Sequence, residues 1–164
     1  MHSPLKIKTN YINILLDIAA QKTRERGDLV YERQLGVSLR DIRLLRLIGV
    51  QPGVVMGELT EQSGIEKTLA SKLVSSLVQR GLVVRQIGHK DARKTHLALS
   101  QDGVNLVERA EPLGEFLERG FGKFLSADEI KSLRTILKKV IEAERVTRPE
   151  FDAWMAQQAN PENS

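Results

Sequence analysis

The spacing of apolar residues along the chain predicts a mainly helical protein with one short β-hairpin near its middle. Between residues 66 and 80, apolar positions recur every three or four residues, as on the buried face of an α-helix. These positions are Leu69, Leu73, Val74, Leu77 and Val78. The opposite side carries short polar or basic side chains, namely Lys67, Thr68, Ser71, Lys72, Ser75 and Gln79. A face with so little apolar bulk suits a helix that lies in a DNA groove.

Signals on both sides of this helix predict a helix-turn-helix followed by a hairpin. Residues 54–62 form a preceding short helix that ends at Gly64, because glycine adopts the left-handed conformation at little steric cost. Gly81 ends the second helix, and residues 82–87 and 94–99 are β-rich. The residues between these two runs are polar and basic, so the hairpin is expected to form a two-stranded β-wing.

Apolar stripes before this region predict two further helices. The first covers residues 6–26, after which a glycine and an aspartate end or loosen it, and residues 29–37 form a mixed connection. An approximate capping box between Ser38 and Asp41 opens the second helix, which continues to residue 48.

Three helices are predicted after the hairpin. Ser100 caps a helix that extends to about residue 124 with a kink at Pro112, and Ser126 opens the next helix with a capping box. Pro149 occupies the first position of a short last helix. The apolar stripe of these last two helices is narrow, as in a helix-pairing seam. The residues predicted to form a dimer interface are Ile130, Leu133, Leu137, Val140, Ile141, Phe151 and Trp154.

Charge is concentrated on the predicted helix-turn-helix and hairpin. Residues 37–99 have 10 basic and 5 acidic side chains, a net charge of +5, whereas residues 100–164 have 9 and 12, a net charge of −3. A basic excess confined to one segment is the expected footprint of a polyanionic partner. No apolar run approaches the roughly 18 residues of a membrane-spanning helix, and cysteine is absent. With no signal-peptide pattern in residues 1–10, we expect a cytoplasmic protein without disulfides.

Three stretches resemble the MarR family of bacterial transcription regulators. They are residues 71–83, which end in Gly-Leu-Val; the Asp-x-Arg of residues 91–93; and residues 97–103, which match Leu-Thr-x-x-Gly except that Ser100 replaces the threonine. Residues 38–41 and the flanking helices also fit. The resemblance covers most of the chain, and the Asp-x-Arg wing is its most specific part.

The resemblance implies a homodimer that binds double-stranded DNA. Residues 1–36 and 101–159 would form its dimerisation helices, residues 37–100 its winged helix-turn-helix, and residues 160–164 a disordered tail. Two winged helices would face successive major grooves of a pseudo-palindromic operator. Members of the family commonly repress transcription, and many release DNA when a small, often aromatic, acid or its thioester binds, usually between the dimer helices and the winged helix.

Individual residues receive expected roles from this arrangement. Base edges or phosphates would be contacted by Lys67, Thr68, Ser71, Lys72 and Ser75 on the helix, and phosphates by His89, Lys90 and Lys94 on the wing. Arg93 matches the family's wing arginine and would enter the minor groove. Asp91 repels phosphate, so we expect it to brace the wing by pairing with an arginine. Arg40 would contact the DNA backbone or pair with an acid, and the sequence leaves both roles open.

An effector pocket is harder to locate, because aromatic residues are scarce. Tyr11, Tyr31 and the helix around Arg43 are candidates, although an apolar helix face with a tyrosine more often belongs to the core. No cofactor or metal site is predicted. The three histidines lack ligand spacing, and no catalytic motif accompanies them, so we do not expect an enzyme. The alternative function is a winged helix that contacts protein or RNA, against which the basic helix and hairpin argue.

Overall fold

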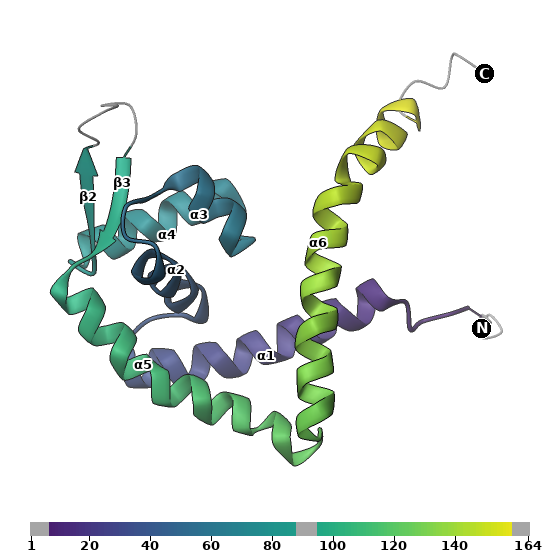
Figure 1. The fold of residues 1–164 in the computed structure, drawn as a ribbon, viewed down its shortest axis with the longest axis horizontal. Coiled ribbons are helices and arrows are strands. Elements are labelled where there is room, and N and C mark those ends of the chain that lie inside the picture. Colours follow the sequence, from purple (N-terminus) through teal and green to yellow (C-terminus); the bar gives the residue numbers. More distant parts are fainter. Residues whose placement is uncertain (1–6, 88–94, 159–164) are drawn as a thin grey trace, which may run out of the picture. The chain divides into compact units, whose positions relative to one another are not determined.

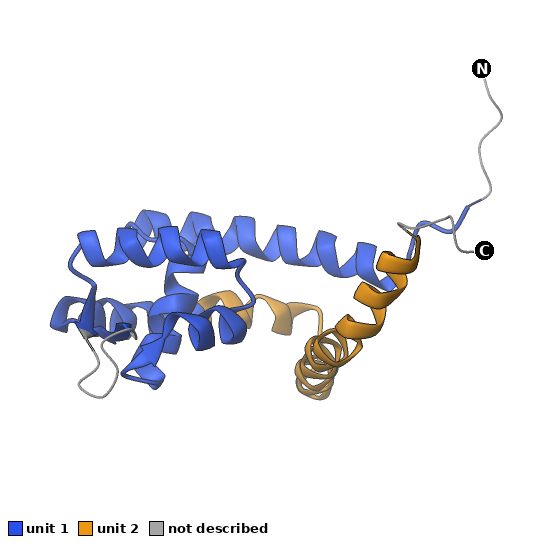
Figure 2. Ribbon diagram, turned by 90° about the horizontal axis from the view of Figure 1, so that it is seen from above, with its two compact units in different colours: residues 1–115 blue, residues 116–164 orange. Residues whose placement is uncertain are grey.

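The structure, a computed structural model, describes residues 7–87 and 95–158. Its elements in chain order are α1 (Ile12–Leu35), α2 (Leu39–Val50), β1 (Val54–Val55), α3 (Met56–Ser63), α4 (Lys67–Gln79), β2 (Val83–Ile87), β3 (Thr95–Leu99), α5 (Gln101–Arg119), the 3-10 helix η1 (Phe121–Lys123) and α6 (Ala127–Gln158) (Figure 1). The fold is mainly helical with one small antiparallel sheet, as predicted. The chain forms two compact units, Met1–Glu115 and Phe116–Ser164, coloured blue and orange in Figure 2.

Helix α2 is the centre of the larger unit. It contacts α1, α3, α4 and β3, and four of its side chains are almost completely buried, namely Ile42, Leu44, Leu45 and Ile48. Its start is fixed by the predicted capping box, which is confirmed. The Ser38 hydroxyl accepts a hydrogen bond from the Asp41 backbone N–H at 3.1 Å, and the Asp41 carboxylate accepts one from the Ser38 N–H at 2.9 Å.

Helix α1 is longer than predicted, because Gly27 lies inside it and does not end it. Gly27 is buried, and a Cβ atom there would lie 3.0 Å from Cδ2 of Leu39, so the glycine lets α1 approach the start of α2 closely. The helix ends at Gly36, whose φ of 68° is left-handed. Tyr31, predicted to lie in a connection, is therefore a helical residue.

The sheet has three strands in the order β1–β3–β2, all antiparallel. The additional strand β1 was predicted as the first turn of a helix. The expectation was wrong because Val54 pairs with Leu97 of β3. The Gly53 N–H donates to the Leu97 carbonyl at 2.8 Å, and the His96 ring bonds the Gly53 carbonyl at 2.7 Å.

Helix α5 begins as predicted, with the Ser100 hydroxyl accepting from the Gly103 N–H at 3.0 Å. It continues through Pro112 but ends at Arg119, a few residues before the predicted limit. Helix α6 begins at the predicted Ser126 capping box and runs without interruption to Gln158. The predicted break at Pro149 is therefore wrong, because one missing backbone hydrogen bond does not end a helix whose flanking residues favour helix. None of the described helices has the length and apolar character needed to cross a bilayer.

Candidate nucleic-acid interface

Helix α4 separates its side chains into a buried and an exposed face. Ala70, Val74 and Leu77 are fully buried against the rest of the larger unit. The residues predicted to contact DNA are all exposed, namely Lys67, Thr68, Ser71, Lys72 and Ser75. They are spaced by three or four residues and so share one side of the helix. The helix therefore presents two ammonium groups and three hydroxyls to solvent on one surface, which we call the polar face of α4.

The first turn of α4 is held by Glu66. Its carboxylate accepts hydrogen bonds from the backbone N–H groups of Thr68 at 2.8 Å and Leu69 at 3.0 Å. These two bonds lower the pKa of Glu66, because they favour its charged form. A charged carboxylate at this position also complements the positive end of the helix dipole. The first turn, which carries Lys67 and Thr68, is therefore ordered by one exposed acid.

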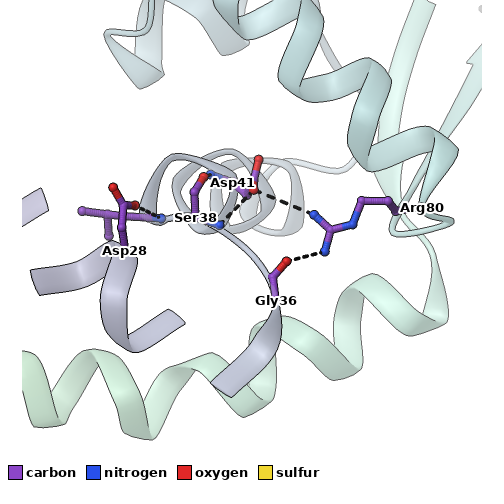
Figure 3. A network of polar contacts seen from close by, with 6 residues as sticks. Asp28, Gly36, Ser38, Asp41 and Arg80 are labelled. Carbon is purple, nitrogen blue, oxygen red and sulfur yellow. Dashed lines mark hydrogen bonds and ion pairs between the residues drawn. The ribbon is translucent and has the colours of Figure 1, made fainter. Parts of the chain in front are cut away.

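Arg80, at the C-terminal end of α4, contacts the end of α1 and the start of α2 (Figure 3). The Arg80 guanidinium donates to the Gly36 carbonyl at 2.8 Å and lies 3.9 Å from the Asp41 carboxylate, which is largely buried. Asp41 also caps α2, and the Asp28 carboxylate accepts from the Leu39 N–H at 2.8 Å. This cluster joins the C-terminal ends of α1 and α4 to the N-terminal end of α2.

The wing begins as the strands β2 and β3, which pair from Val83–Leu99 to Ile87–Thr95. The tip of the wing, with the predicted contacts His89, Lys90, Asp91, Arg93 and Lys94, lies outside the described residues. Their assignments remain predictions.

Sequence reasoning missed Arg85, which connects the wing to the polar face of α4. It lies on β2, is exposed, and donates a hydrogen bond from its guanidinium to the Ser75 hydroxyl at 2.9 Å. The available signal was that Arg85 is the one charged residue in the predicted strand over 82–87, and a charged side chain is seldom buried without a partner. Arg85 thus adds a positive charge beside the residues already predicted to contact DNA.

A pocket of about 380 Å³ opens beside the first turn of α4. Its walls come from α1, the start of α2 and the α3–α4 turn, and three arginines line it: Arg24, Arg40 and Arg43. Of the three residues predicted for an effector site, Arg43 lines this pocket. Tyr31 is buried, with its hydroxyl near the backbone of Gly114, and Tyr11 is the exposed N-cap of α1. The structure does not bring the two tyrosines to Arg43.

In the C-terminal unit, α6 contains no buried residue within the described part of the chain. Among the residues predicted to form a dimer seam, Ile130 and Val140 are half-buried, and the others are exposed: Leu133, Leu137, Ile141, Phe151 and Trp154. The rings of Phe151 and Trp154 are in contact, with centroids 6.2 Å apart. Along the described length of α6, this series of apolar side chains is therefore open to solvent in the single chain. Across residues 7–87 and 95–158, no acidic or histidine side chains group in a way that could hold a metal ion.

Comparison with known proteins places these features in a family of regulators. The model of the MarR family matches residues 35–94, from the end of α1 to the wing. The transcriptional regulator BilQ from Clostridium symbiosum is 30% identical over 105 residues, which cover 64% of this chain and 73% of BilQ.

Solved structures of the same fold include complexes. A MarR variant from Escherichia coli bound to operator DNA has a TM-score of 0.71 and 24% identity, covering 79% of this chain and 92% of that one. The PcaV regulator from Streptomyces coelicolor, in complex with its natural ligand, has a TM-score of 0.70 and 19% identity, covering 84% and 99%. At these identities the structural likeness concerns the fold.

Proposed function

The chain belongs to the MarR family of transcriptional regulators, and from this premise we propose that it is a homodimeric repressor that binds a pseudo-palindromic operator. Membership of a family of regulators confirms the prediction that the protein is not an enzyme. The fold alone does not specify function, so the proposal depends on the residues that the fold presents.

The observation that carries the proposal is the polar face of α4. In a helix-turn-helix the second helix enters the major groove, where side chains from its first turns reach the base edges. Lys67, Thr68, Ser71 and Lys72 occupy those turns and are exposed. Lysine commonly contacts guanine, and hydroxyl side chains accept or donate at several bases. We therefore assign base reading to this face and refer to α4 as the recognition helix.

Positive charge beside the recognition helix supports contacts to the DNA backbone. Arg85 lies beside Ser75 at the base of the wing, and we propose that it contacts a phosphate. For the wing tip we propose the roles given by the resemblance: phosphate contacts for His89, Lys90 and Lys94, insertion of Arg93 into the minor groove, and a bracing ion pair for Asp91.

Dimerisation is proposed through the uncovered apolar faces of the helices that flank the winged helix. In α6 these are Leu133, Leu137, Ile141, Phe151 and Trp154, and in the first half of α1 they are Ile12, Leu15 and Ile18. Exposed apolar series of this kind mark association surfaces. A two-fold dimer places two recognition helices about one DNA turn apart, which is the geometry that a pseudo-palindromic operator requires.

An effector is the last part of the proposal. The pocket beside the recognition helix is large enough for a small molecule, and PcaV, which shares the fold, binds its natural ligand. A ligand that binds the DNA-free conformation better than the DNA-bound one releases the operator in proportion to that difference. We propose a small organic acid or its thioester as this ligand.

The test is a binding titration with the DNA upstream of the protein's own gene, repeated over a range of salt concentrations. If each protomer neutralises about three phosphates, the slope of log K against log salt is about −5 for the dimer, at roughly −0.9 per phosphate. A slope flatter than about −2 contradicts this electrostatic mode. If the protein binds no DNA duplex at low salt and micromolar concentration, the alternative function is favoured, a winged helix that contacts protein or RNA.

A further inference from the structure

The pocket beside the recognition helix has an unusual balance of charge. Arg24 comes from α1, and Arg40 and Arg43 come from the first turns of α2, so three arginine residues line one cavity of about 380 Å³. Within the described part of the chain, none of the three forms an ion pair with a carboxylate. Arg43 donates to the Ser63 carbonyl at 3.0 Å, which occupies one of the five N–H donors of its guanidinium.

The three arginines are close enough to influence one another. Although the side chain of Arg43 is exposed to solvent over part of its surface, the surrounding protein desolvates its guanidinium and lowers its pKa. The charges of Arg40 and Arg24 lower that pKa further, because like charges disfavour one another. A bound anion would relieve this repulsion, so the cluster is arranged to receive negative charge.

Glu66 does not neutralise the three arginines of the pocket. It is the acidic residue of the pocket lining, but its carboxylate is already engaged by the N–H groups of Thr68 and Leu69. Three cations and one committed anion leave an excess of two positive charges. The remaining walls include apolar side chains, among them Leu39, Ile65 and Leu69, which favour a ligand with an apolar body over a bare inorganic ion.

We propose that this pocket binds a small organic dianion, either a dicarboxylate or a phosphate monoester, and that the bound dianion weakens operator binding through Glu66. The ligand is held by Arg24, Arg40 and Arg43, whose planar forks match carboxylate and phosphate oxygens. Its charge lies beside the carboxylate that caps the recognition helix, and repulsion between the two disturbs the first turn that carries Lys67 and Thr68. The effect on DNA rests on the function proposed above, whereas binding to the free protein does not.

Ligand binding is tested by calorimetry on the free, full-length protein with three probes that share a benzene ring. Phthalate carries two carboxylates, phenyl phosphate carries a dianionic phosphate near pH 8, and benzoate carries one charge. The expected result is that phthalate or phenyl phosphate binds at least about tenfold more tightly than benzoate, and their order identifies the headgroup. If benzoate binds as tightly as phthalate and phenyl phosphate, the proposed preference for a dianion is wrong. If none of the three probes binds at millimolar concentration, the pocket is not an anion-binding site.

Substitutions separate the pocket from general positive charge. Arg24→Gln and Arg43→Gln each remove a charged hydrogen-bond donor. We expect each substitution to lower the affinity for the dianion by about tenfold or more. Arg33→Gln is the matched control, because Arg33 lies on α1 outside the pocket lining and is exposed. An equal loss of affinity in all three variants shows attraction to net charge and overturns the proposal, and the melting temperature of each variant checks that it is folded.

The coupling to DNA is tested in the same variants by titrating operator with and without the tighter dianion. Because the two binding equilibria are linked, the bound dianion lowers the affinity for operator DNA by the same factor by which bound DNA lowers the affinity for the dianion. Glu66→Gln keeps an oxygen to cap the helix but removes the charge, so we expect it to bind the dianion and to show a smaller effect on DNA. An unchanged operator affinity in the presence of bound dianion overturns the coupling. Absence of operator binding under every condition overturns the proposed function and leaves the calorimetric result standing.

Discussion

Gly103 shows how a single residue positions the wing against α5. A Cβ atom at this position would lie 2.1 Å from the Leu82 carbonyl oxygen, far inside van der Waals contact. The same carbonyl accepts a hydrogen bond from the Ser100 N–H at 3.1 Å, and the Ser100 hydroxyl donates to the Gly81 carbonyl at 2.5 Å. The glycine is therefore required by the close approach of another backbone segment, at the point where the recognition helix passes into β2.

Gly103→Ala is expected to destabilise the protein, because the backbone around Leu82 must move. Overpacking of this kind typically costs about 1–3 kcal/mol, measured as the free energy of unfolding in denaturant. The control is Gly57→Ala, at an exposed position of α3 where a Cβ atom would meet nothing within 4 Å. There alanine is expected to raise stability by up to about 1 kcal/mol. An equal free energy of unfolding for the two variants would show that the backbone at Leu82 does not exclude a Cβ atom at residue 103.

At the wing, Arg93→Ala is expected to weaken operator binding and leave the dimer intact. Removing one charged interaction with DNA from each protomer should reduce affinity by about tenfold or more, and the salt dependence should become less steep. Binding titrations at two salt concentrations measure both effects, and sedimentation checks the dimer. Lys123→Ala, which removes an exposed cation outside the proposed interface, is the control. Wild-type affinity in the Arg93 variant would mean that the wing does not enter the groove.

At the scale of elements, α2 organises the larger unit because three other helices and the sheet pack around it. Its N-terminal end is satisfied by Ser38, Asp41 and Asp28, and Arg80 brings the end of the recognition helix to the same cluster (Figure 3). The orientation of the recognition helix is thus fixed at its C-terminal end by an ordered polar network. Its N-terminal end, capped by the exposed Glu66, borders the arginine pocket and is the end at which we propose that a ligand acts.

Ser38→Ala tests the contribution of the α2 cap. Removal of the hydroxyl leaves the Asp41 N–H without its partner, and the expected cost is about 1 kcal/mol, typical of a serine N-cap. Thermal unfolding followed by circular dichroism measures this difference. Ser76→Ala, on the exposed surface of α4, serves as the comparison and should not lower the melting temperature. A Ser38 variant as stable as the Ser76 variant would show that the cap contributes little.

At the scale of the whole molecule, the two compact units differ in how completely they bury their apolar residues. The larger unit has a core with many side chains less than 2% exposed, whereas α6 of the C-terminal unit, over its described length, has no buried residue. The proposed pairing with a second copy would remove Leu137, Phe151 and Trp154 from water and so stabilise the protein. The proposed dimer would therefore bury the apolar surface that α6 leaves exposed in the single chain.

Leu137→Asp should convert the dimer to a monomer. Leu137 is 38% exposed in the isolated chain, so a carboxylate is tolerated there, but in a dimer seam the unpaired charge costs several kcal/mol. Sedimentation at micromolar protein measures the change, and circular dichroism checks that the helices persist. Lys138→Asp, one residue away and exposed, is the control and should remain dimeric. A dimer that survives the Leu137 substitution would place the interface elsewhere.

Elements that depend on neighbouring residues could be predicted from the amino-acid sequence. Capping boxes at Ser38 and Ser126, left-handed glycines after α3 and α4, and the two faces of the recognition helix follow from nearby residues, because capping and helical periodicity act within a few positions. The exposed polar face of α4 was predictable for the same reason.

Other features depend on residues that are distant in the sequence and come together only in the folded protein. Gly27 lies within α1 because α2 packs against it, and Val54 forms a strand because Leu97 is beside it. Likewise, Arg85 meets Ser75, and Arg24 joins Arg40 and Arg43, only after folding brings separate elements together.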